Sequence, residues 1–381
     1  MNQLRQKIEQ EIRERGPIPF SRYMELCLYH PELGYYSRNA QQFGKAGDFY
    51  TASDVHAVFG RLLARQFEEM WRVLGSPEQI ELLELGPGRG LFAQDVLDWS
   101  EKKFSDFYRA LCYILVESSG PLRQRIKETL GHHLESGRAE LGALDGFGKT
   151  SGRNTPTVVF TNEFFDAVPV EILSKRGSLR IDTCDGRFIE TWVQSFPEEL
   201  EFLDRHSVHP EPDERIEVPL AAQRFMEQIA ANIQHGFLVA IDYGYTRDEQ
   251  LAGRHRGTLK AIRQHSLTAN PYEAPGEQDI TADVNFTALA AAAEKHGMQT
   301  QRLITQSQFL MGIGEANQFA DAFEECRLPQ ERAKVALQLK HLVTPAGMGE
   351  SFQVLIASTG VQQESVKSLS GLSFGRDAFV P

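Results

Sequence analysis

Three glycines occupy alternate positions in the segment ELGPGRG, residues 84–90, directly after an apolar run. They are Gly86, Gly88 and Gly90, and an ordinary surface turn explains one or two glycines better than an alternating trio. Glycine has no Cβ, so a ligand can approach the backbone closely, and a helix that starts after the loop offers free N–H groups. A loop that joins a strand to a helix in this way predicts a cofactor site.

Two classes of cofactor use such a loop. A dinucleotide requires a small residue three positions after the second glycine, and Gly88, Gly90 and Ala93 have that spacing. S-adenosylmethionine (SAM) is bound by loops of the form E-L-G-x-G-x-G, which also accounts for Glu84 and Gly86. The second match is fuller, so the motif favours a methyltransferase over a dehydrogenase.

Either cofactor requires an acidic residue at the end of the next strand, where it accepts hydrogen bonds from the ribose hydroxyls. Glu117, in the segment YILVESS, has this position. A strand-end carboxylate that only faces water is the simpler interpretation. Its coincidence with the glycine loop favours the ribose contact.

Polar residues also follow a third apolar run, in TNEFFDAVPV at 161–170. Asn162, Glu163 and Asp166 lie there among apolar residues, which is costly unless the polar groups are paired or used. They could orient a cationic nucleophile and take up its proton. Helix capping by Asn162 or Asp166 is the alternative, but it does not explain all three. We expect Glu163 to be the first catalytic carboxylate and Asp166 the second, with no metal required.

The elements that position these residues alternate between strands and helices. Strands are expected at 79–86, 111–117, 157–165, 236–245 and 352–359. Helices are expected at 91–104 and 120–131. Apolar runs that alternate with helices predict an α/β fold with a mostly parallel sheet covered on both faces.

Composition excludes several classes of function. The 381 residues carry a formal net charge of −12, which argues against a nucleic-acid partner. The four cysteines lie far apart and form no CxxC, so neither a zinc knuckle nor a redox dithiol is expected. We interpret His132-His133 as loop histidines without ligand partners. No run of about 18 apolar residues exists, so stable membrane insertion is not expected.

The N-terminal segment predicts an amphipathic helix, because Leu4, Ile8 and Ile12 are spaced four apart. It is rich in glutamate and has no apolar stretch typical of a signal peptide. A cytoplasmic protein is therefore expected.

Longer blocks of the sequence resemble the MidA-like family of SAM-dependent methyltransferases, which includes relatives needed for assembly of mitochondrial complex I. The resemblance implies a class I methyltransferase fold, which is Rossmann-like, with an N-terminal helical extension and inserted β-hairpin and helical elements. It covers nearly the whole chain, and the blocks are 17–37, 43–60, 84–90, 116–126, 162–170, 241–245, 257–265, 276–289 and 309–314.

The resemblance also implies roles for single residues. The segment GDFYT at 47–51 is a loop that closes over the cofactor. Asp283 and Asn285 stand where histidine and aspartate are usual in the family, in a segment expected to touch substrate. The implied residues are, for the cofactor, Glu84, Gly86, Gly88, Gly90, Glu117, Ser118, Asn162, Asp48 and Thr51, and, for the substrate, His265, Asp242 and Tyr243.

The expected organisation has four parts. They are an N-terminal helical extension with the cofactor-covering loop at 1–75, a Rossmann-like core at 76–170 and 236–361, inserted hairpins and an acidic loop at 171–235, and a loosely held polar tail at 362–381.

We expect a SAM-dependent methyltransferase that acts on arginine of a protein, with a respiratory complex subunit as the partner. An arginine nucleophile is charged before it reacts, since the pKa of its guanidinium lies far above neutral pH, and a carboxylate that pairs with it fixes its plane. Two alternatives stay open: a SAM-binding assembly factor that docks without catalysis, and a nucleotide-dependent oxidoreductase. The sequence leaves open the oligomeric state and whether the basic run 254–263 or the acidic loop 198–217 contacts a partner.

Overall fold

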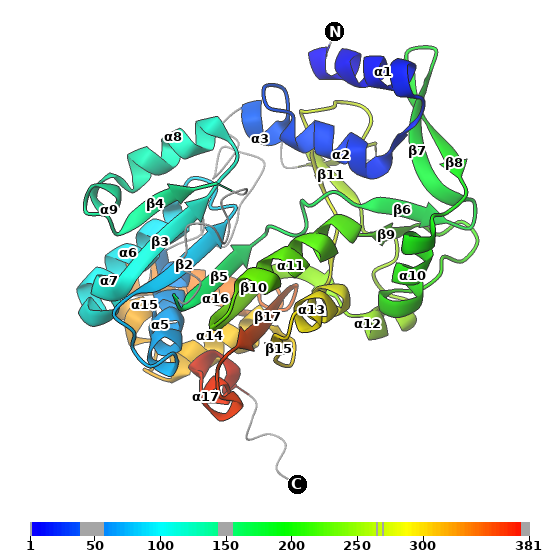
Figure 1. Cartoon of the computed structure of the whole chain (residues 1–381). Coiled ribbons are helices and arrows are strands. Elements are labelled where there is room, and N and C mark those ends of the chain that lie inside the picture. The colour runs from blue at the N-terminus through cyan, green and yellow to red at the C-terminus, as the bar shows by residue number, and fades with distance from the viewer. Residues whose placement is uncertain (1, 39–56, 144–154, 264–265, 269, 375–381) are drawn as a thin grey trace. The chain divides into compact units, whose positions relative to one another are not determined.

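The computed structural model describes residues 2–38, 57–143, 155–263, 266–268 and 270–374, and these form two compact units (Figure 1). Unit 1 takes its described residues from Met1–Phe49, Glu163–Glu227 and Tyr243–Ala292. Unit 2 takes its described residues from Tyr50–Asn162, Gln228–Asp242 and Ala293–Pro381. Within the described ranges, we find no helix whose length and apolar character would let it cross a membrane.

Unit 2 contains a sheet in the order β15-β17-β10-β5-β2-β3-β4, with β16 beside β17. The neighbouring strands from β10 to β4 are parallel, and Leu82 lies opposite Tyr113 and Val158. The strands are β2 (Ile80–Leu85), β3 (Leu111–Val116), β4 (Ala139–Gly142), β5 (Thr157–Asn162), β10 (Gly236–Tyr245), β15 (Gln299–Thr300), β16 (Ile304–Thr305) and β17 (Phe352–Thr359). Their buried residues confirm the predicted α/β fold with a mostly parallel sheet.

The helices of unit 2 include both predicted ones. Pro121 is in the first turn of α8, and the Ser119 side chain accepts a hydrogen bond from the Leu122 N–H at its start. Phe92 of α6 stacks on Phe160 of β5 with ring centres 4.6 Å apart. The helices are α5 (Ala57–Val73), α6 (Leu91–Lys103), α7 (Ser105–Ala110), α8 (Gly120–Thr129), α9 (Gly131–Glu135), α14 (Gln306–Glu315), α15 (Ala320–Phe323), α16 (Pro329–Val343) and α17 (Gln363–Lys367).

Residues 363–372 are held more firmly than the sequence suggested. Helix α17 is followed by the 3-10 turn η3 (Ser370–Leu372), and Val366 and Leu369 are buried. The Gly371 N–H donates a hydrogen bond of 2.8 Å to the Gln66 side chain of α5. A few buried apolar residues therefore hold residues 363–372 against unit 2, although the polar composition of the segment predicted a loosely held tail.

Unit 1 has a sheet in the order β1-β7-β6-β9 with β8 beside β7, and a second sheet in the order β12-β11-β13. Its strands are β1 (Ile18–Pro19), β6 (Glu171–Ser174), β7 (Gly177–Cys184), β8 (Arg187–Val193), β9 (Ile216–Val218), β11 (Lys260–Arg263), β12 (Ser266–Thr268), β13 (Asp279–Thr281) and β14 (Val284–Asn285), which pairs with the end of β10. Its helices are α1 (Gln3–Arg15), α2 (Phe20–Tyr29), α3 (Tyr35–Arg38), α10 (Pro197–His206), α11 (Leu220–Asn232), α12 (Arg247–Leu251) and α13 (Phe286–Lys295), of which α11 and α13 end in unit 2.

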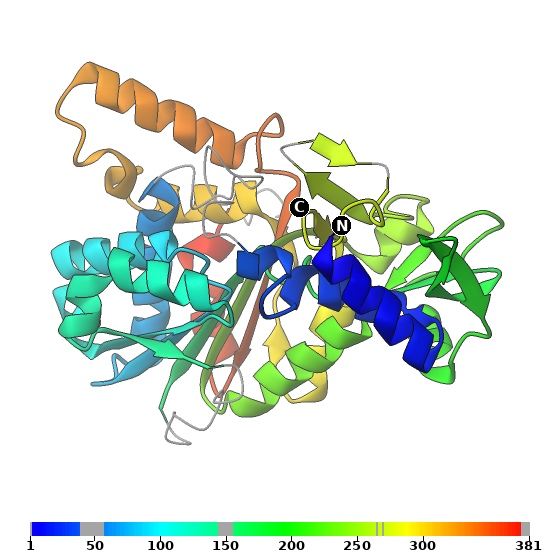
Figure 2. The ribbon, with the colours of Figure 1, turned by 90° about the horizontal axis from the view of Figure 1, so that it is seen from above.

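The amphipathic N-terminal helix is confirmed as α1, which buries Leu4, Ile8 and Ile12. Figure 2 shows α1 beside the hairpin of β7 and β8, where the Arg5 guanidinium lies 4.7 Å from the centre of the Phe188 ring. The predicted hairpins are also confirmed. Their second turn has Asp185 and Gly186 at φ of 49° and 70°, as a tight hairpin turn requires.

The segment 195–219, which includes the expected acidic loop 198–217, is not a loop. It contains α10 and β9, and Glu199 and Glu217 are buried. The Glu199 side chain accepts hydrogen bonds from the Phe196 N–H and the Ser178 hydroxyl. The Glu217 carboxyl accepts from the Thr258 hydroxyl. The acidic composition of the segment gave no sign that two of its carboxyls are buried and hydrogen-bonded.

Candidate active site

The order of the strands in unit 2 reverses at β2. From β2 the chain passes to β3 and β4 on one side, and it later returns to β5 on the other side of β2. Open α/β sheets bind ligands at the carboxyl ends of the strands at such a reversal. Gly86 follows β2, Glu117 follows β3 and Asn162 ends β5, so the topology brings these three residues to one edge of the sheet.

The glycine loop adopts a conformation that residues with a Cβ rarely take. The φ angles of Gly86, Gly88 and Gly90 are 70°, 54° and 77°. The Gly86 N–H donates to the Val116 carbonyl at 3.1 Å, and the Gly90 N–H donates to the Pro87 carbonyl at 2.9 Å. Gly90 then starts α6 without a side-chain cap. The loop therefore presents bare backbone at a helix N-terminus, which fits an approaching cofactor.

Glu117 lies next to this loop. Its carboxylate accepts a 2.8 Å hydrogen bond from the Ser119 N–H. Burial raises the pKa of Glu117 to about 7, and hydrogen bonds from the backbone of Ser119, Ser118 and Gly88 oppose that rise. The Ser118 side chain is exposed. A half-buried carboxylate that faces a glycine loop is suited to accept hydrogen bonds from vicinal hydroxyls.

Glu84 has a different setting. Only 5% of the residue is exposed, and its carboxyl accepts a 2.9 Å hydrogen bond from the Tyr113 hydroxyl. Burial raises the pKa of Glu84 to about 8, and the charge of Glu117 adds to the effect. Glu84 therefore links β2 to β3 as a largely protonated acid near pH 7. Its predicted contact with the cofactor stays a prediction.

In unit 1, the segment that follows β5 begins with Glu163, whose φ of 50° places a residue with a side chain in the left-handed region. Asp166 is 3% exposed and accepts a hydrogen bond from the Tyr243 hydroxyl. Its backbone carbonyl accepts from the Ala282 N–H at 3.0 Å. No helix occurs between β5 and β6 in the described chain, so the helix-capping interpretation of Asn162 and Asp166 is wrong.

Burial raises the pKa of Asp166 to about 6. The hydrogen bonds from Tyr243 and from the backbone of Ala167, together with the positive charge of Lys260, limit this rise. The Tyr243 ring is in turn covered by the Lys260 ammonium, 5.3 Å from the ring centre. Asp166 is therefore a buried carboxylate that stays ionised at neutral pH because a hydroxyl and a cation support it.

Two further sets of hydrogen-bonded groups belong to this part of unit 1. Asp283 lies in the segment expected to touch substrate, but its bonding partners were not predicted. Asp283 accepts a 2.8 Å hydrogen bond from Lys260 and pairs with the His255 ring at 3.0 Å. The Tyr36 hydroxyl donates a 3.0 Å hydrogen bond to Asp279. Lys260 and the two aspartates lie in the blocks 257–265 and 276–289, which carry the family resemblance. The pairing of β11 with β13 brings these blocks together, and the sequence does not predict that pairing.

The charged runs are largely neutralised within unit 1. Each basic side chain of the run 254–263 has an acidic partner, and the acidic segment also pairs with other cations. The pairs are Arg254–Glu249, His255–Asp283, Arg256–Glu214, Lys260–Asp283, Arg263–Glu277, Lys175–Glu211, Arg224–Glu198, Arg205–Glu201 and His209–Asp204. Neither run is therefore an unpaired charged surface.

The other predicted site residues have varied settings. Asn162 is half-buried at the end of β5, and Asp242 is buried in β10. Asp48, Thr51 and His265 lie outside the described residues.

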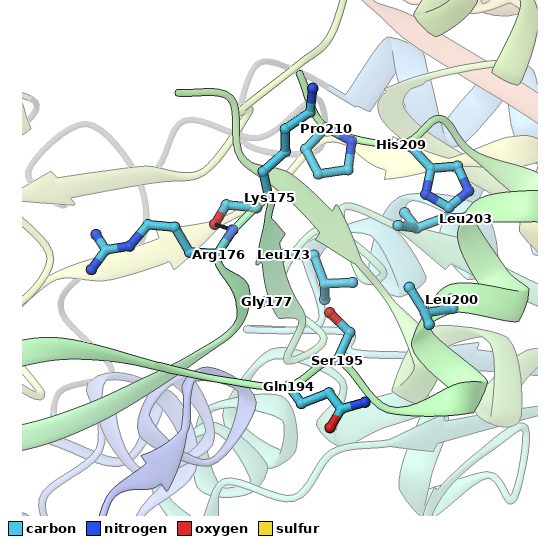
Figure 3. A pocket seen from close by; sticks show the side chains of 11 residues that line it. Leu173, Lys175, Arg176, Gly177, Gln194, Ser195, Leu200, Leu203, His209 and Pro210 are labelled. Carbon is cyan, nitrogen blue, oxygen red and sulfur yellow. Dashed lines mark hydrogen bonds between the residues drawn. The ribbon is translucent and has the colours of Figure 1, made fainter. Parts of the chain in front are cut away.

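A hollow of about 480 Å³ lies elsewhere in unit 1, near the turn between β6 and β7 (Figure 3). The Lys175 ammonium pairs with Glu211 at 3.2 Å, and the His209 ring lies 2.7 Å from Asp204. Arg176 extends away from the other labelled side chains. None of the predicted site residues lines it, and its lining residues are Leu173, Ser174, Lys175, Arg176, Gly177, Gln194, Ser195, Leu200, Leu203, His209 and Pro210.

Curated relatives cover most of the chain. The protein arginine methyltransferase NDUFAF7 homolog of Drosophila melanogaster is 29% identical, over 94% of this chain and 85% of the relative. The protein arginine methyltransferase NDUFAF7 of Homo sapiens is 28% identical, over 90% of this chain and 80% of the relative.

Both relatives are named as mitochondrial proteins. The expectation of a cytoplasmic location is therefore wrong. It rested on the composition of the N-terminal segment, which reflects the packing of α1 in unit 1 and not the compartment.

Two solved structures from Burkholderia thailandensis share the fold. One is bound to S-adenosyl-homocysteine, with 29% identity, a TM-score of 0.82 and coverage of 97% of this chain and 94% of that chain. A native structure has 27% identity, a TM-score of 0.80 and the same coverage. A family model described as an S-adenosyl-L-methionine-dependent methyltransferase matches residues 62–304. With the glycine loop and Glu117 at the expected edge of the sheet, the chain belongs to the MidA-like family of SAM-dependent methyltransferases, and its cofactor is SAM.

Proposed function

We propose that this methyltransferase modifies arginine side chains of a protein substrate. The observation that carries the proposal is the carboxylate pair Glu163 and Asp166 directly after β5, of which Asp166 is buried and supported by Tyr243. A buried carboxylate that stays ionised suits a cationic acceptor such as guanidinium. The names of the relatives, protein arginine methyltransferases, support the same acceptor.

The roles of the two carboxylates follow from the chemistry of the acceptor. When bound, SAM supplies a methyl group on a positively charged sulfur. Glu163 pairs with the guanidinium, fixes its plane and aligns the attacking nitrogen, and alignment of this kind lowers a barrier by several kcal/mol. Asp166 adds a second negative charge, and either carboxylate can accept the proton that the methylated nitrogen releases.

The cofactor is held by the chain's own backbone and acids in this proposal. Gly86, Gly88 and Gly90 let it approach the start of α6, and Glu117 accepts hydrogen bonds from its ribose hydroxyls. Secondary contacts are proposed for the remaining cofactor residues, which are Glu84, Ser118, Asn162, Asp48 and Thr51.

The protein substrate is proposed to be a respiratory complex subunit, as the family resemblance implies. Asp242, Tyr243 and His265 are proposed to contact it. Tyr243 also donates to Asp166, so one residue would connect substrate binding to the state of the carboxylate.

The test is methyl transfer from labelled SAM to a lysate of the source organism, followed by mass spectrometry of the labelled sites. Methylarginine in a respiratory subunit is the expected result. Label on another residue type would contradict the arginine assignment. SAM binding by calorimetry without any transfer would favour the alternative of an assembly factor that acts by docking.

Cofactor affinity is expected to fall in mild acid. Glu117 must be ionised to accept two ribose hydrogen bonds, and its pKa in the free protein is about 7. The pKa is raised, so ionisation is incomplete below pH 7, and the dissociation constant for SAM should be roughly tenfold higher at pH 6 than at pH 8. Calorimetric titration at both pH values measures this difference. In the Glu117→Gln variant, binding should be weaker at both pH values and nearly independent of pH, and an equally flat wild type would contradict the ribose role.

The loss of turnover at acidic pH is expected to reflect protonation of Asp166. At saturating SAM, kcat should decline as pH falls through about 6, because Asp166 then loses its charge. The Tyr243 hydrogen bond lowers the pKa of Asp166, so Tyr243→Phe should raise that pKa and move this loss of turnover to higher pH. The measurement is the pH profile of kcat for both proteins. Loss of turnover at an unchanged pH in Tyr243→Phe would show that another group controls turnover.

A further inference from the structure

Two histidines and two carboxylates converge on the surface of unit 2, outside the candidate active site. The histidines were expected in a loop, but they belong to α9, and the carboxylates Asp98 and Glu101 lie three residues apart on α6. The His133 Nε2 lies 2.7 Å from Asp98, and the His132 Nε2 lies 3.8 Å from Glu101. The ligand atoms of Glu101, His132 and His133 lie within 4.8 Å of one another.

We propose that His132, His133, Glu101 and Asp98 form a binding site for a divalent transition metal, with zinc as the fitting ion. Two imidazoles and carboxylate oxygens make a donor set that zinc binds in tetrahedral geometry. Magnesium and calcium prefer oxygen ligands alone, so they should not compete.

The His133 side chain is already oriented for such a role. It is 3% exposed, and the Tyr108 hydroxyl lies 2.9 Å from its Nδ1. A metal-ligating histidine typically has its second nitrogen bonded to an outer group that fixes the ring. With metal on Nε2, the ring proton lies on Nδ1 and is donated to the Tyr108 oxygen.

The remaining side chains make the site accessible from solvent. The His132 side chain is 71% exposed and that of Glu101 is 48% exposed, so both can rotate to shorten their present separation. His133 then forms the fixed part of the site, while His132, Glu101 and Asp98, whose side chain is 61% exposed, complete it. Because some of the ligands must move to bind the metal, we expect reversible binding and not a permanent structural metal centre.

A metal here would tie α6 to α9 within unit 2. Helix α6 starts at the glycine loop, and α8 and α9 follow the Glu117 segment. The tie should therefore stabilise the half of the sheet layer that carries the cofactor residues. Binding of an ion to the folded state alone raises the melting temperature by mass action.

The experiment uses the full chain, freed of metal with a chelator, and zinc chloride as the probe. Calorimetry should show one zinc per chain, and excess zinc should raise the melting temperature by a few degrees. His132→Ala and Glu101→Gln alter exposed side chains and should fold normally. Each should weaken zinc binding at least tenfold and abolish the thermal shift.

Two controls distinguish binding at this site from non-specific metal binding. His341→Ala removes an exposed histidine of α16 in the same unit and should leave zinc affinity unchanged. Magnesium chloride should give neither heat nor thermal shift. Equal zinc affinity in the wild type and His132→Ala, or a loss in His341→Ala as large as in His132→Ala, would overturn the proposal.

Discussion

Replacing Glu163 by glutamine is expected to lower kcat about 100-fold, the usual scale for removing one preorganised electrostatic contact, while the dissociation constant for SAM changes less than twofold. Glutamine keeps the size and the backbone requirements of glutamate, so only the charge is lost. The interaction is made as the guanidinium is aligned, and its loss should therefore appear in kcat more than in KM.

Three measurements interpret this variant: SAM affinity, melting temperature and methyl transfer to the native substrate. Glu201→Gln is the matched control, because Glu201 is another carboxylate of unit 1 and pairs only locally with Arg205. It should retain full activity. Wild-type turnover by Glu163→Gln would show that the carboxylate is structural.

A companion variant uses the backbone of the same residue. The φ of 50° at Glu163 is unfavourable for a residue with a Cβ, by about 1 kcal/mol, and glycine removes that cost. Glu163→Gly should therefore keep or raise the melting temperature and still lose turnover. Such a result would mean that the strained conformation is retained for function and not for stability.

Gly88→Val is expected to abolish SAM binding, with affinity at least 100-fold lower. The φ of 54° is poorly accessible to a β-branched residue, and the added methyl groups would occupy space at the backbone that the cofactor approaches. Calorimetry with SAM and with S-adenosyl-homocysteine measures the loss.

The matched control separates strain from obstruction. Gly137 also has a left-handed φ, of 70°, and a Cβ added there would meet nothing within 4 Å. Gly137→Val should lose similar stability, roughly 1–2 kcal/mol, and bind SAM normally. If Gly88→Val folds and binds SAM as tightly as the wild type, the loop is not the cofactor site.

The parts of the fold that the sequence predicted well are those set by local pattern. The run before Gly86 is apolar because β2 is covered on both faces, and Pro121 marks the start of α8 because proline suits a first helical turn. The position of Glu117 beside the glycine loop was predicted because strand geometry fixes it, and its contact with the ribose stays a prediction. Such signals are contained within about 30 residues.

The parts that failed depend on pairing between distant residues. Lys260 and Asp283 meet because β11 pairs with β13, and the sequence shows only a basic run and, further on, an aspartate. His133 meets Asp98 because α9 packs near α6. In each case the partner determines whether a charge is a surface feature or part of a site, and no local pattern identifies the partner.

The interleaved composition of unit 1 has a consequence for synthesis on the ribosome. The Asn2 side chain donates to the Pro275 carbonyl, 273 residues further along, and Ile18 of β1 pairs with Ile181 of β7. At a translation rate of about 5–20 residues per second, roughly 14–55 s pass between the synthesis of α1 and that of Pro275. Throughout this interval the apolar face formed by Leu4, Ile8 and Ile12 lacks its final partners. The nascent chain therefore exposes an apolar face until the last segment of unit 1 has emerged, and exposed apolar surface of this kind is what chaperones shield during synthesis.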